Sequence, residues 1–215
     1  APPLPPLPTR PFAEQAREWL IAKGVDNATV SDDGVITASD DVVLSGLRLK
    51  ALPAKFDTVA GDFTLIGGLV ESFRNFPESV GGALYLGRLG MTDLKGCPSK
   101  VGDSLSLHDL ENLKSLETDT PIECKDLTIS IANLKSLKNI HKTFKRVDGK
   151  IKIGHPINDS VLGLLSIKGV KSVEMHFSNR NVADILNKQL SSDDKDIHVA
   201  QEELIDGGFA AFARL

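Results

Sequence analysis

Apolar positions recur with a period of 21 residues through the middle of the chain. Three segments, Val59–Leu65, Val80–Leu86 and Val101–Leu107, share one pattern: a valine, a glycine within the next two positions, then two apolar residues flanking one other residue. A fixed period of this length is typical of stacked supersecondary units, each of which must share the apolar face of its neighbour. The pattern therefore predicts an elongated solenoid with a continuous core.

The end of each repeat predicts a short strand. In Phe63–Leu65 the period of two directs the first and third side chains inward and Thr64 outward. The same alternation occurs in five further tripeptides, which start at Leu47, Leu84, Leu105, Leu127 and Ile151. Stacked in parallel, the six tripeptides form one ribbon-like sheet of about six turns. The expected partner-binding row consists of the outward residues and the adjacent histidine: Arg48, Thr64, Tyr85, Ser106, His108, Thr128 and Lys152.

A second apolar phrase lies between the predicted strands. Asn112–Leu116 and Asn133–Leu137 are identical and again 21 residues apart, and Val70–Phe73 and Met91–Leu94 resemble their last four residues. This phrase is expected to return the chain behind the sheet. The spacing lengthens before Phe144, so the fifth turn is expected to contain a longer loop.

Helical patterns flank the repeats. Thr9 can cap a helix over 11–23 that ends at Gly24, and Trp19 on that helix is expected to cover the first repeat. Val35–Ile36 and Val42–Leu44 are short strand candidates before the repeats. After Ile153 the period fails, and the sequence predicts a short helix over 161–167, a last strand over 175–177 and two closing helices with apolar stripes over 182–190 and 199–212.

Composition and charge exclude several classes of protein. A hydrophobic content of 41% is enough for a continuous core, and a formal net charge of −4 argues against general affinity for nucleic acid or anionic lipid. No apolar run approaches 18 residues, so no membrane span is expected. The first residues lack the basic and apolar parts of a secretory signal, which indicates a cytoplasmic protein.

The residue types that carry chemistry are scattered. The five histidines and the two cysteines, Cys97 and Cys124, have no metal-ligand spacing, and two cysteines cannot form a disulfide framework. The glycine pairs at 67–68 and 81–82 do not continue as a phosphate-binding loop. We therefore expect no catalytic residue, no metal and no cofactor. The oligomeric state is left open.

The first ten residues are rich in proline and predict an extended polyproline II arm. Within them, Pro5, Pro8 and Arg10 match a Pro-x-x-Pro-x-Arg pattern, which docks into aromatic grooves in other proteins. A spacer or packing arm is the alternative interpretation.

A basic run stands out against the acidic background. It could bind nucleic acid or an acidic protein, although no aromatic residues interleave with it for base stacking. A solvated face is the simpler interpretation. The run consists of Lys135, Lys138, Lys142, Lys145, Arg146, Lys150 and Lys152.

The repeats resemble the leucine-rich-repeat-like proteins of tailed bacteriophages, whose units read approximately Leu-x-x-Leu-x-Gly-x-Pro-x-x-Val-x-Gly-x-Phe/Leu-x-Leu/Cys. The closest copy here is Met91–Leu107, and the resemblance extends over about 47–153. The turn asparagines of that family are absent at the equivalent positions, so no asparagine ladder is expected. The resemblance implies a binding scaffold without catalytic residues.

The sequence thus predicts an α+β fold: a leucine-rich-repeat-like solenoid with a parallel β ribbon and a helical cap at each end. The expected divisions are an arm at 1–10, an N-terminal helix and capping segment at 11–46, the solenoid at 47–177 and a C-terminal helical cap at 178–215. The last segment is too short for a separate catalytic domain. The expected function is a non-enzymatic scaffold that binds a host or virion protein, in the host cytoplasm or on the virion, with nucleic-acid association as the alternative.

Overall fold

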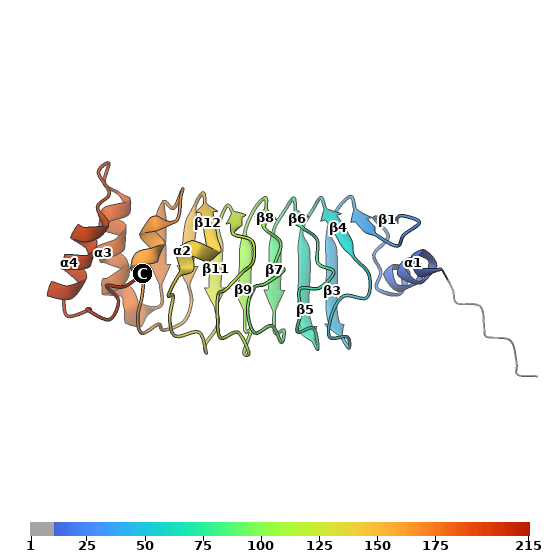
Figure 1. Ribbon diagram of the computed structural model, residues 1–215, viewed down its shortest axis with the longest axis horizontal. Helices are drawn as coiled ribbons and strands as arrows, with labels where there is room; N and C mark the ends of the chain where they lie inside the picture. The colour runs from blue at the N-terminus through green and yellow to red at the C-terminus, as the bar shows by residue number, and fades with distance from the viewer. Residues whose placement is uncertain (1–10) are drawn as a thin grey trace, which may run out of the picture.

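The computed structural model describes residues 11–215, which form an elongated parallel β-solenoid of about seven turns (Figure 1). Two sheets of seven strands run along its length, one on each side of the core. Thr9 and the proline-rich arm lie outside the described residues. The solenoid prediction is therefore confirmed in its coarse form.

The two sheets differ in strand length. The short-strand sheet contains, in spatial order, β1 (Ala28–Val30), β2 (Ile36–Ala38), β4 (Phe56–Val59), β6 (Ser79–Val80), β8 (Lys100–Val101), β10 (Ile122–Cys124) and β12 (Phe144–Val147). The long-strand sheet contains β3 (Val42–Leu47), β5 (Phe63–Gly68), β7 (Leu84–Gly87), β9 (Leu105–His108), β11 (Leu127–Ser130), β13 (Lys150–Ile153) and β14 (Ser172–Met175). All neighbours pair in parallel except β1 and β2.

Helices lie at both ends and beside the later turns. They are α1 (Phe12–Ala22), α2 (Ile140–Thr143), α3 (Arg180–Leu190) and α4 (Ile197–Asp206), with the 3₁₀ helices η1 (Leu162–Ser166) and η2 (Phe177–Asn179). Asp196 caps α4, since its carboxylate accepts the N–H of His198 at 2.8 Å.

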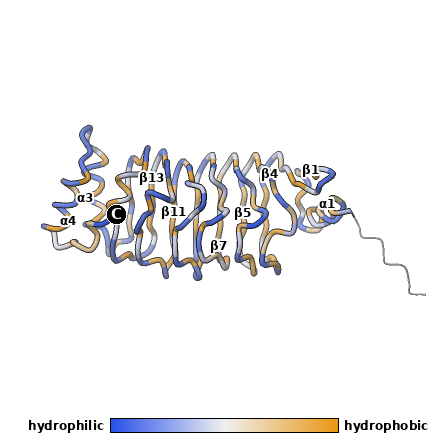
Figure 2. The backbone as a smooth tube through the Cα atoms, in the orientation of Figure 1, coloured by the Kyte–Doolittle hydropathy of each residue, from blue (hydrophilic) through white to orange (hydrophobic). Residues whose placement is uncertain are grey.

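The predicted stacking of the inward residues is confirmed. Phe63 is in register with Leu84, and Leu84 is in register with Leu105; all three side chains are fully buried. Along the chain, apolar residues alternate with polar ones on the strands (Figure 2). The parallel register therefore turns a sequence period of 21 into one continuous column of side chains.

The predicted opening of the sheet was wrong. Val42–Leu44, rather than Leu47–Leu49, pairs with Phe63–Leu65, and β3 ends at Leu47, directly after Gly46, where φ is +59°. Arg48 therefore lies past a corner and Val43 takes its expected place. At the other end the last strand is Ser172–Met175, three residues earlier than predicted.

The short-strand sheet was not predicted. The valines that mark each repeat, Val59, Val80 and Val101, lie in it and point into the core. Two of its strands contain only two residues, such as Ser79–Val80, which is too short to show a period of two. The chain behind the long-strand sheet is thus a second sheet rather than only a returning loop.

The N-terminal part of the core is aromatic. Trp19 on α1 contacts Phe56 edge-on with ring centroids 6.5 Å apart, and Phe56 contacts Phe63 at 5.6 Å. Phe76 continues the series at 5.6 Å from Phe63. Further along, leucine and isoleucine fill the same column. Such edge-on pairs add to the hydrophobic stabilisation of their burial.

Aspartates hold the corner between the two sheets. The carboxylate of Asp41 accepts the N–H of Asp62 at 2.7 Å, Asp62 accepts that of Ala83 at 2.7 Å, and Asp126 accepts that of Lys150 at 2.7 Å. Aspartates at this corner therefore bond the backbone of one turn to that of the next.

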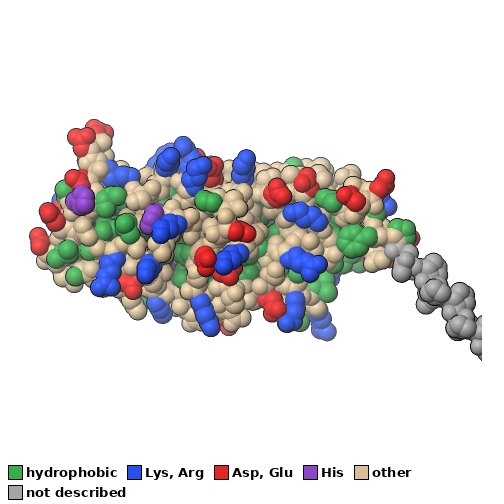
Figure 3. All heavy atoms as spheres, viewed as in Figure 1, with side chains coloured by type: hydrophobic (Ala, Val, Ile, Leu, Met, Phe, Trp, Pro, Cys, Tyr) green, Lys and Arg blue, Asp and Glu red, His purple; other side chains and the backbone are tan. Residues whose placement is uncertain are grey.

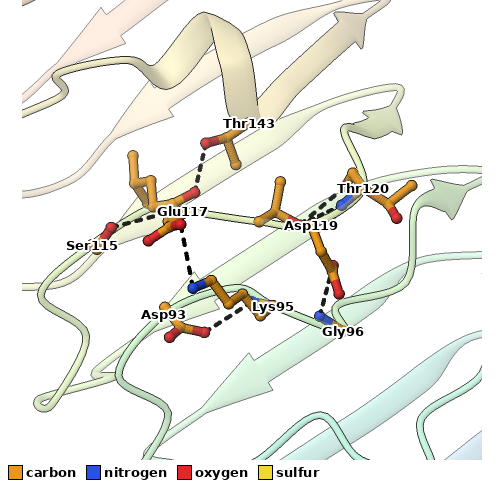
Figure 4. A network of polar contacts seen from close by, with 10 residues as sticks. Asp93, Lys95, Gly96, Ser115, Glu117, Asp119, Thr120 and Thr143 are labelled. Carbon is orange, nitrogen blue, oxygen red and sulfur yellow. Dashed lines mark hydrogen bonds and ion pairs between the residues drawn. The ribbon is translucent and has the colours of Figure 1, made fainter.

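The serine of the repeated Leu-Lys-Ser-Leu phrase forms a local turn. Ser115 Oγ accepts the N–H of Glu117 at 3.0 Å, and Asp93 in the preceding turn accepts that of Lys95 at 2.9 Å. Ser72 and Ser136 accept in the same way. Successive turns are then linked by an ion pair between Lys95 and Glu117 at 3.2 Å (Figure 4). Hydrogen bonds from a backbone N–H to a serine or aspartate side chain two residues earlier favour turns. The phrase therefore turns the chain back toward the short-strand sheet.

Candidate protein-interaction face

One row of outward side chains follows the long-strand sheet from end to end. The strand register places these residues side by side, one from each strand, and we call them the outer row: Val43, Thr64, Tyr85, Ser106, Thr128, Lys152 and Glu174. Of the seven residues predicted for the row, the five outward residues Thr64, Tyr85, Ser106, Thr128 and Lys152 stand in it, and His108 lies beside it on β9. Arg48 does not stand in the row, and Val43 and Glu174 complete it.

Tyr85 and His108 form an aromatic pair near the middle of the outer row. Their ring centroids are 5.2 Å apart and the ring planes differ by 18°, which is a stacked arrangement. His108 follows the outer row by two residues on β9 and is in register with Gly87. A Cβ atom at Gly87 would lie 3.3 Å from the Tyr85 ring. Glycine at this position therefore leaves room for the tyrosine ring beside the histidine.

The chemistry of the face changes along its length. Near the N-terminal end it presents Val43, of which 62% is exposed, together with Thr64 and Ile66. Hydroxyl groups of Ser106 and Thr128 follow the aromatic pair. The N-terminal half is therefore largely uncharged and contains the aromatic anchor.

The C-terminal end of the face is charged. Glu174 lies between Lys152, at 3.1 Å, and Lys150, at 3.3 Å. These two ammonium groups lower the pKa of the Glu174 carboxyl, with the hydrogen bond from Lys152 as the largest cause. The predicted row therefore includes Lys152 but not its ion-pair partner Glu174, which the sequence interpretation did not name.

The basic run does not form one patch. Lys152 lies on the long-strand sheet, Arg146 faces outward on the short-strand sheet beside Glu123, and Lys138 and Lys142 line a hollow of about 390 Å³ next to α2. One turn of a solenoid travels around the whole molecule, so neighbours in sequence are distributed over several faces. Lys135, the first residue of the run, lies close enough to His155 to disfavour its protonation.

Carboxylates neutralise part of the run. Lys145 pairs with Glu123 at 3.4 Å and Arg146 with Asp148 at 2.7 Å. Lys150 and Lys152 pair with Glu174, as above. Figure 3 shows cationic and anionic side chains interspersed over the face in view. Four of the seven predicted basic residues therefore have a carboxylate partner.

A groove of about 570 Å³ lies over the short-strand sheet. Its lining includes Ser79, Lys100, Glu123 and Arg146, which are the outward residues of neighbouring strands, and the backbone of Gly81. Sequence reasoning named only Arg146 among these residues, as part of the basic run, and missed Ser79, Lys100 and Glu123 because strands of two or three residues show no alternation. The groove is charged and lies on the opposite side of the core from the outer row.

Other predicted candidates lie apart from the outer row. Among residues 11–215, no group of histidine, cysteine, aspartate or glutamate side chains has the geometry of a metal site. Cys97 and Cys124 are buried and free, and burial raises the pKa of both thiols, that of Cys124 to about 12. Both thiols are therefore unreactive in the folded chain. Pro5, Pro8 and Arg10 lie outside the described residues.

His155 is a buried polar residue that the sequence interpretation did not single out. Its Nδ1 accepts the N–H of Ile131 at 3.2 Å, and its Nε2 lies 2.6 Å from the carbonyl oxygen of Leu134. This pattern requires a neutral ring that is protonated at Nε2. Burial is the main cause that lowers the pKa of His155. The side chain therefore joins two turns and has a structural role.

No helix in the described part of the chain is both long and apolar enough to cross a bilayer. Comparison with protein-family models, with curated proteins and with solved structures finds no match for this chain.

Proposed function

We propose that this protein is a non-enzymatic scaffold that binds another protein through the outer face of the long-strand sheet. The observation that carries the proposal is the stacked Tyr85–His108 pair, which stands in the middle of a regular row of outward side chains. Aromatic side chains are effective anchors at interfaces because they bring large contact area with few rotatable bonds.

The surroundings of the pair support this role. Gly87 and the uncharged residues Thr64 and Ser106 leave the rings accessible, and 36% of Tyr85 is exposed. The strands fix the spacing of these side chains, so little conformational entropy is lost when a partner binds. A partner with an apolar centre and polar surroundings would match this face. The resemblance to phage repeat proteins favours a host or virion protein as that partner.

The end helices are proposed to act as caps. Ala16 and Leu20 of α1 belong to the core cluster, and Trp19 packs against it. At the other end Leu186 of α3 and Leu204 of α4 are fully buried. Terminal units of this kind keep a repetitive core from being exposed at its ends. The caps would make the face a rigid surface over its whole length.

The alternative, nucleic-acid binding through the basic run, has weaker support. Its residues lie on several faces, and four of the seven have carboxylate partners. Binding of this kind would depend steeply on salt concentration. A gel-shift series with DNA and RNA at low salt tests it: retention that falls with added salt would favour this alternative over the scaffold.

Quantitative capture from host lysate tests the scaffold function. Immobilised wild type, Tyr85→Ala, Thr64→Arg and the control Lys100→Ala, which changes the opposite sheet, are compared after checking that all four unfold at the same urea concentration. We expect one or more proteins to be captured by wild type and the control and to be reduced at least tenfold by both face variants. Equal recovery of every captured protein by all four forms would exclude this face.

A further inference from the structure

The long-strand sheet ends at β3 with an unpaired edge. In the spatial order of the described strands, β5 lies on one side of β3 and no strand lies on the other. The strand has six residues, Val42–Leu47, and contains neither charge nor proline. Natural proteins commonly protect such edges with short strands, charges, prolines or a covering element, because an exposed edge can pair with another chain.

The backbone of β3 has free hydrogen-bonding groups on this edge. Val42 donates its N–H to the carbonyl oxygen of Asp62 on the β5 side. Because backbone groups alternate between the two sides of a strand, those of Val43 and Ser45 point away from β5. Among the described residues, no hydrogen bond from another segment reaches the backbone of Val43 or Ser45. Two N–H and two C=O groups are therefore available.

The sequence around this strand is complementary to itself. Asp40 and Asp41 precede it and Arg48 follows it, so one end is acidic and the other basic. In an antiparallel pair of two such strands, Val43 of each copy lies opposite Ser45 of the other, and Leu44 faces its own equivalent. This arrangement brings the acidic end of each strand beside the basic end of the other. A parallel arrangement would place like charges together.

The charged side chains at the two ends of β3 are available to form ion pairs with a second copy. Within residues 11–215, Arg48 is exposed without an ion pair, and the Asp40 carboxylate accepts only the N–H of its neighbour Asp41. Asp41 is already occupied, since it accepts the N–H of Asp62. Asp40 and Arg48 are therefore the residues expected to select the antiparallel direction.

We propose that the exposed edge of β3 binds the same edge of a second copy of this chain, which joins two solenoids at their N-terminal ends. The two-fold arrangement makes four backbone hydrogen bonds between Val43 and Ser45 of the two copies and two Asp40–Arg48 pairs. The pairing continues the long-strand sheet of one copy into that of the other. It uses the backbone edge of β3 rather than the Tyr85–His108 pair on which the proposed interaction face depends, so either proposal can fail alone.

The dimer is expected to be weak. A single pair of six-residue strands buries less than the roughly 1,200 Å² of a stable protein interface. We therefore expect a dissociation constant in the micromolar range or above, with monomer and dimer in rapid exchange. Concentration dependence is then the property to measure.

Sedimentation equilibrium over a range of protein concentrations tests the proposal. Wild type should shift from the 23.1 kDa of one chain toward twice that mass as concentration rises. Ser45→Pro removes one edge N–H without affecting the β5 side and should abolish the shift; Val43→Lys provides a second edge variant if the proline variant does not fold. Asp57→Arg, an exposed charge change on β4, should dimerise like wild type.

A charge swap distinguishes β3 pairing from any other contact. Asp40→Arg and Arg48→Asp should each weaken dimerisation roughly tenfold, because each places like charges together twice, and the double variant should restore it. Three results would overturn the proposal: a monomer at every concentration, a dimer that Ser45→Pro and Val43→Lys leave unchanged, or a double variant no better than the single ones. Removal of residues 1–10 should change nothing; a dimer that forms only after their removal would show that this segment occupies the edge, and would also overturn it.

Discussion

The two ends of the long-strand sheet terminate the same repeat in different ways. At the C-terminal end, the side chain of Asn187 on α3 bonds both backbone groups of Val173 in β14, accepting its N–H at 2.8 Å and donating to its C=O at 2.8 Å. At the N-terminal end, the backbone of Val43 and Ser45 has no such partner among residues 11–215. A single amide side chain can therefore replace the next strand of a sheet.

The C-terminal end repeats this device. Asn179 accepts the N–H of Ile157 at 3.0 Å and donates to its carbonyl oxygen at 3.0 Å. The last residues of the chain accept the backbone N–H groups of Ser160, Val161 and Leu162. At the N-terminal end, α1 instead contributes apolar packing, with Trp19 against Phe56. The C-terminal end therefore covers the apolar core and also provides hydrogen-bond partners for backbone groups. Among the described residues, the N-terminal end covers the core but leaves the edge of β3 without partners.

The largest expected effect comes from the apolar packing at the C-terminal end. Leu186→Ala removes a fully buried side chain of α3 and should lower the free energy of unfolding by about 2–5 kcal/mol. Ile21→Ala on α1, where 76% of the side chain is exposed, should change it by less than about 0.5 kcal/mol. Urea unfolding followed by circular dichroism measures both. Similar losses for the two variants would contradict the assignment of Leu186 to the core.

The second prediction removes the amide that covers β14. Asn187→Ala leaves the N–H and C=O of Val173 without their partner, which should cost roughly 1–3 kcal/mol. The matched control is Asn133→Ala, whose exposed amide makes one bond, to the carbonyl oxygen of Glu111, and should cost less than about 1 kcal/mol.

Hydrogen exchange adds a local measurement to this comparison. In Asn187→Ala the amide of Val173 should exchange faster, while that of Leu105 in the middle of the same sheet should keep its protection relative to global unfolding. Unchanged exchange at Val173 would show that Asn187 does not protect the edge.

The period of 21 residues was enough to predict the stacking of the long strands and the direction of their side chains. Phe63, Leu84 and Leu105 are neighbours because they repeat at that period. The bonding of Asn187 to β14 could not be predicted. Asn187 lies 14 residues from Val173, and no sequence pattern indicates which backbone group the side chain of a helical asparagine will bond. The opening strand was misassigned because Leu47–Leu49 has the same alternation as the true strands.

The candidate face was predicted by position but not by its contacts. Thr64, Tyr85 and Ser106 stand where the period placed them. The stacking of Tyr85 on His108 is accommodated by Gly87, whose Cβ would lie 3.3 Å from the tyrosine ring and which the sequence interpretation did not single out. The basic run was predicted as a cluster because its residues are close in sequence, whereas one turn of the solenoid separates them in space.

The third prediction concerns pH at the C-terminal part of the solenoid. Burial lowers the pKa of His155 in the folded chain, so the unfolded chain binds more protons below its ordinary pKa of about 6.5. The contribution of His155 to the free energy of unfolding should therefore be constant above that pH and should fall as the pH drops below it. Loss of the bond from Ile131 alone would cost about 1 kcal/mol.

Urea midpoints at pH 7.5 and pH 5.5 measure this effect. His155→Gln should be less stable than wild type at pH 7.5 but should lose less on acidification. Because the neighbouring turns contain Lys135 and His176, which both disfavour a charged His155, the same pair of measurements is made at high salt. Equal losses for wild type and variant on acidification would remove His155 as the cause.

The smallest expected effect concerns the ion pairs at the charged end of the outer row. Glu174→Gln removes the carboxylate between Lys150 and Lys152, whose side chains are about half exposed. The matched variant Glu71→Gln removes the carboxylate that pairs with Lys50 near the other end. Each change should cost less than about 1 kcal/mol, with Glu174→Gln the larger because two ammonium groups lose their partner and repel each other.

The lysines lower the pKa of Glu174, so its contribution to the free energy of unfolding is present above the ordinary carboxyl pKa and is lost as the pH falls through the lowered value. Both differences should shrink as salt is raised from 0.05 M to 1 M, because exposed charges are screened within a few ångströms at the higher concentration. If Glu71→Gln cost as much as Glu174→Gln at low salt, the two ends would not differ in their charges, and the open edge of β3 would remain as the difference between them.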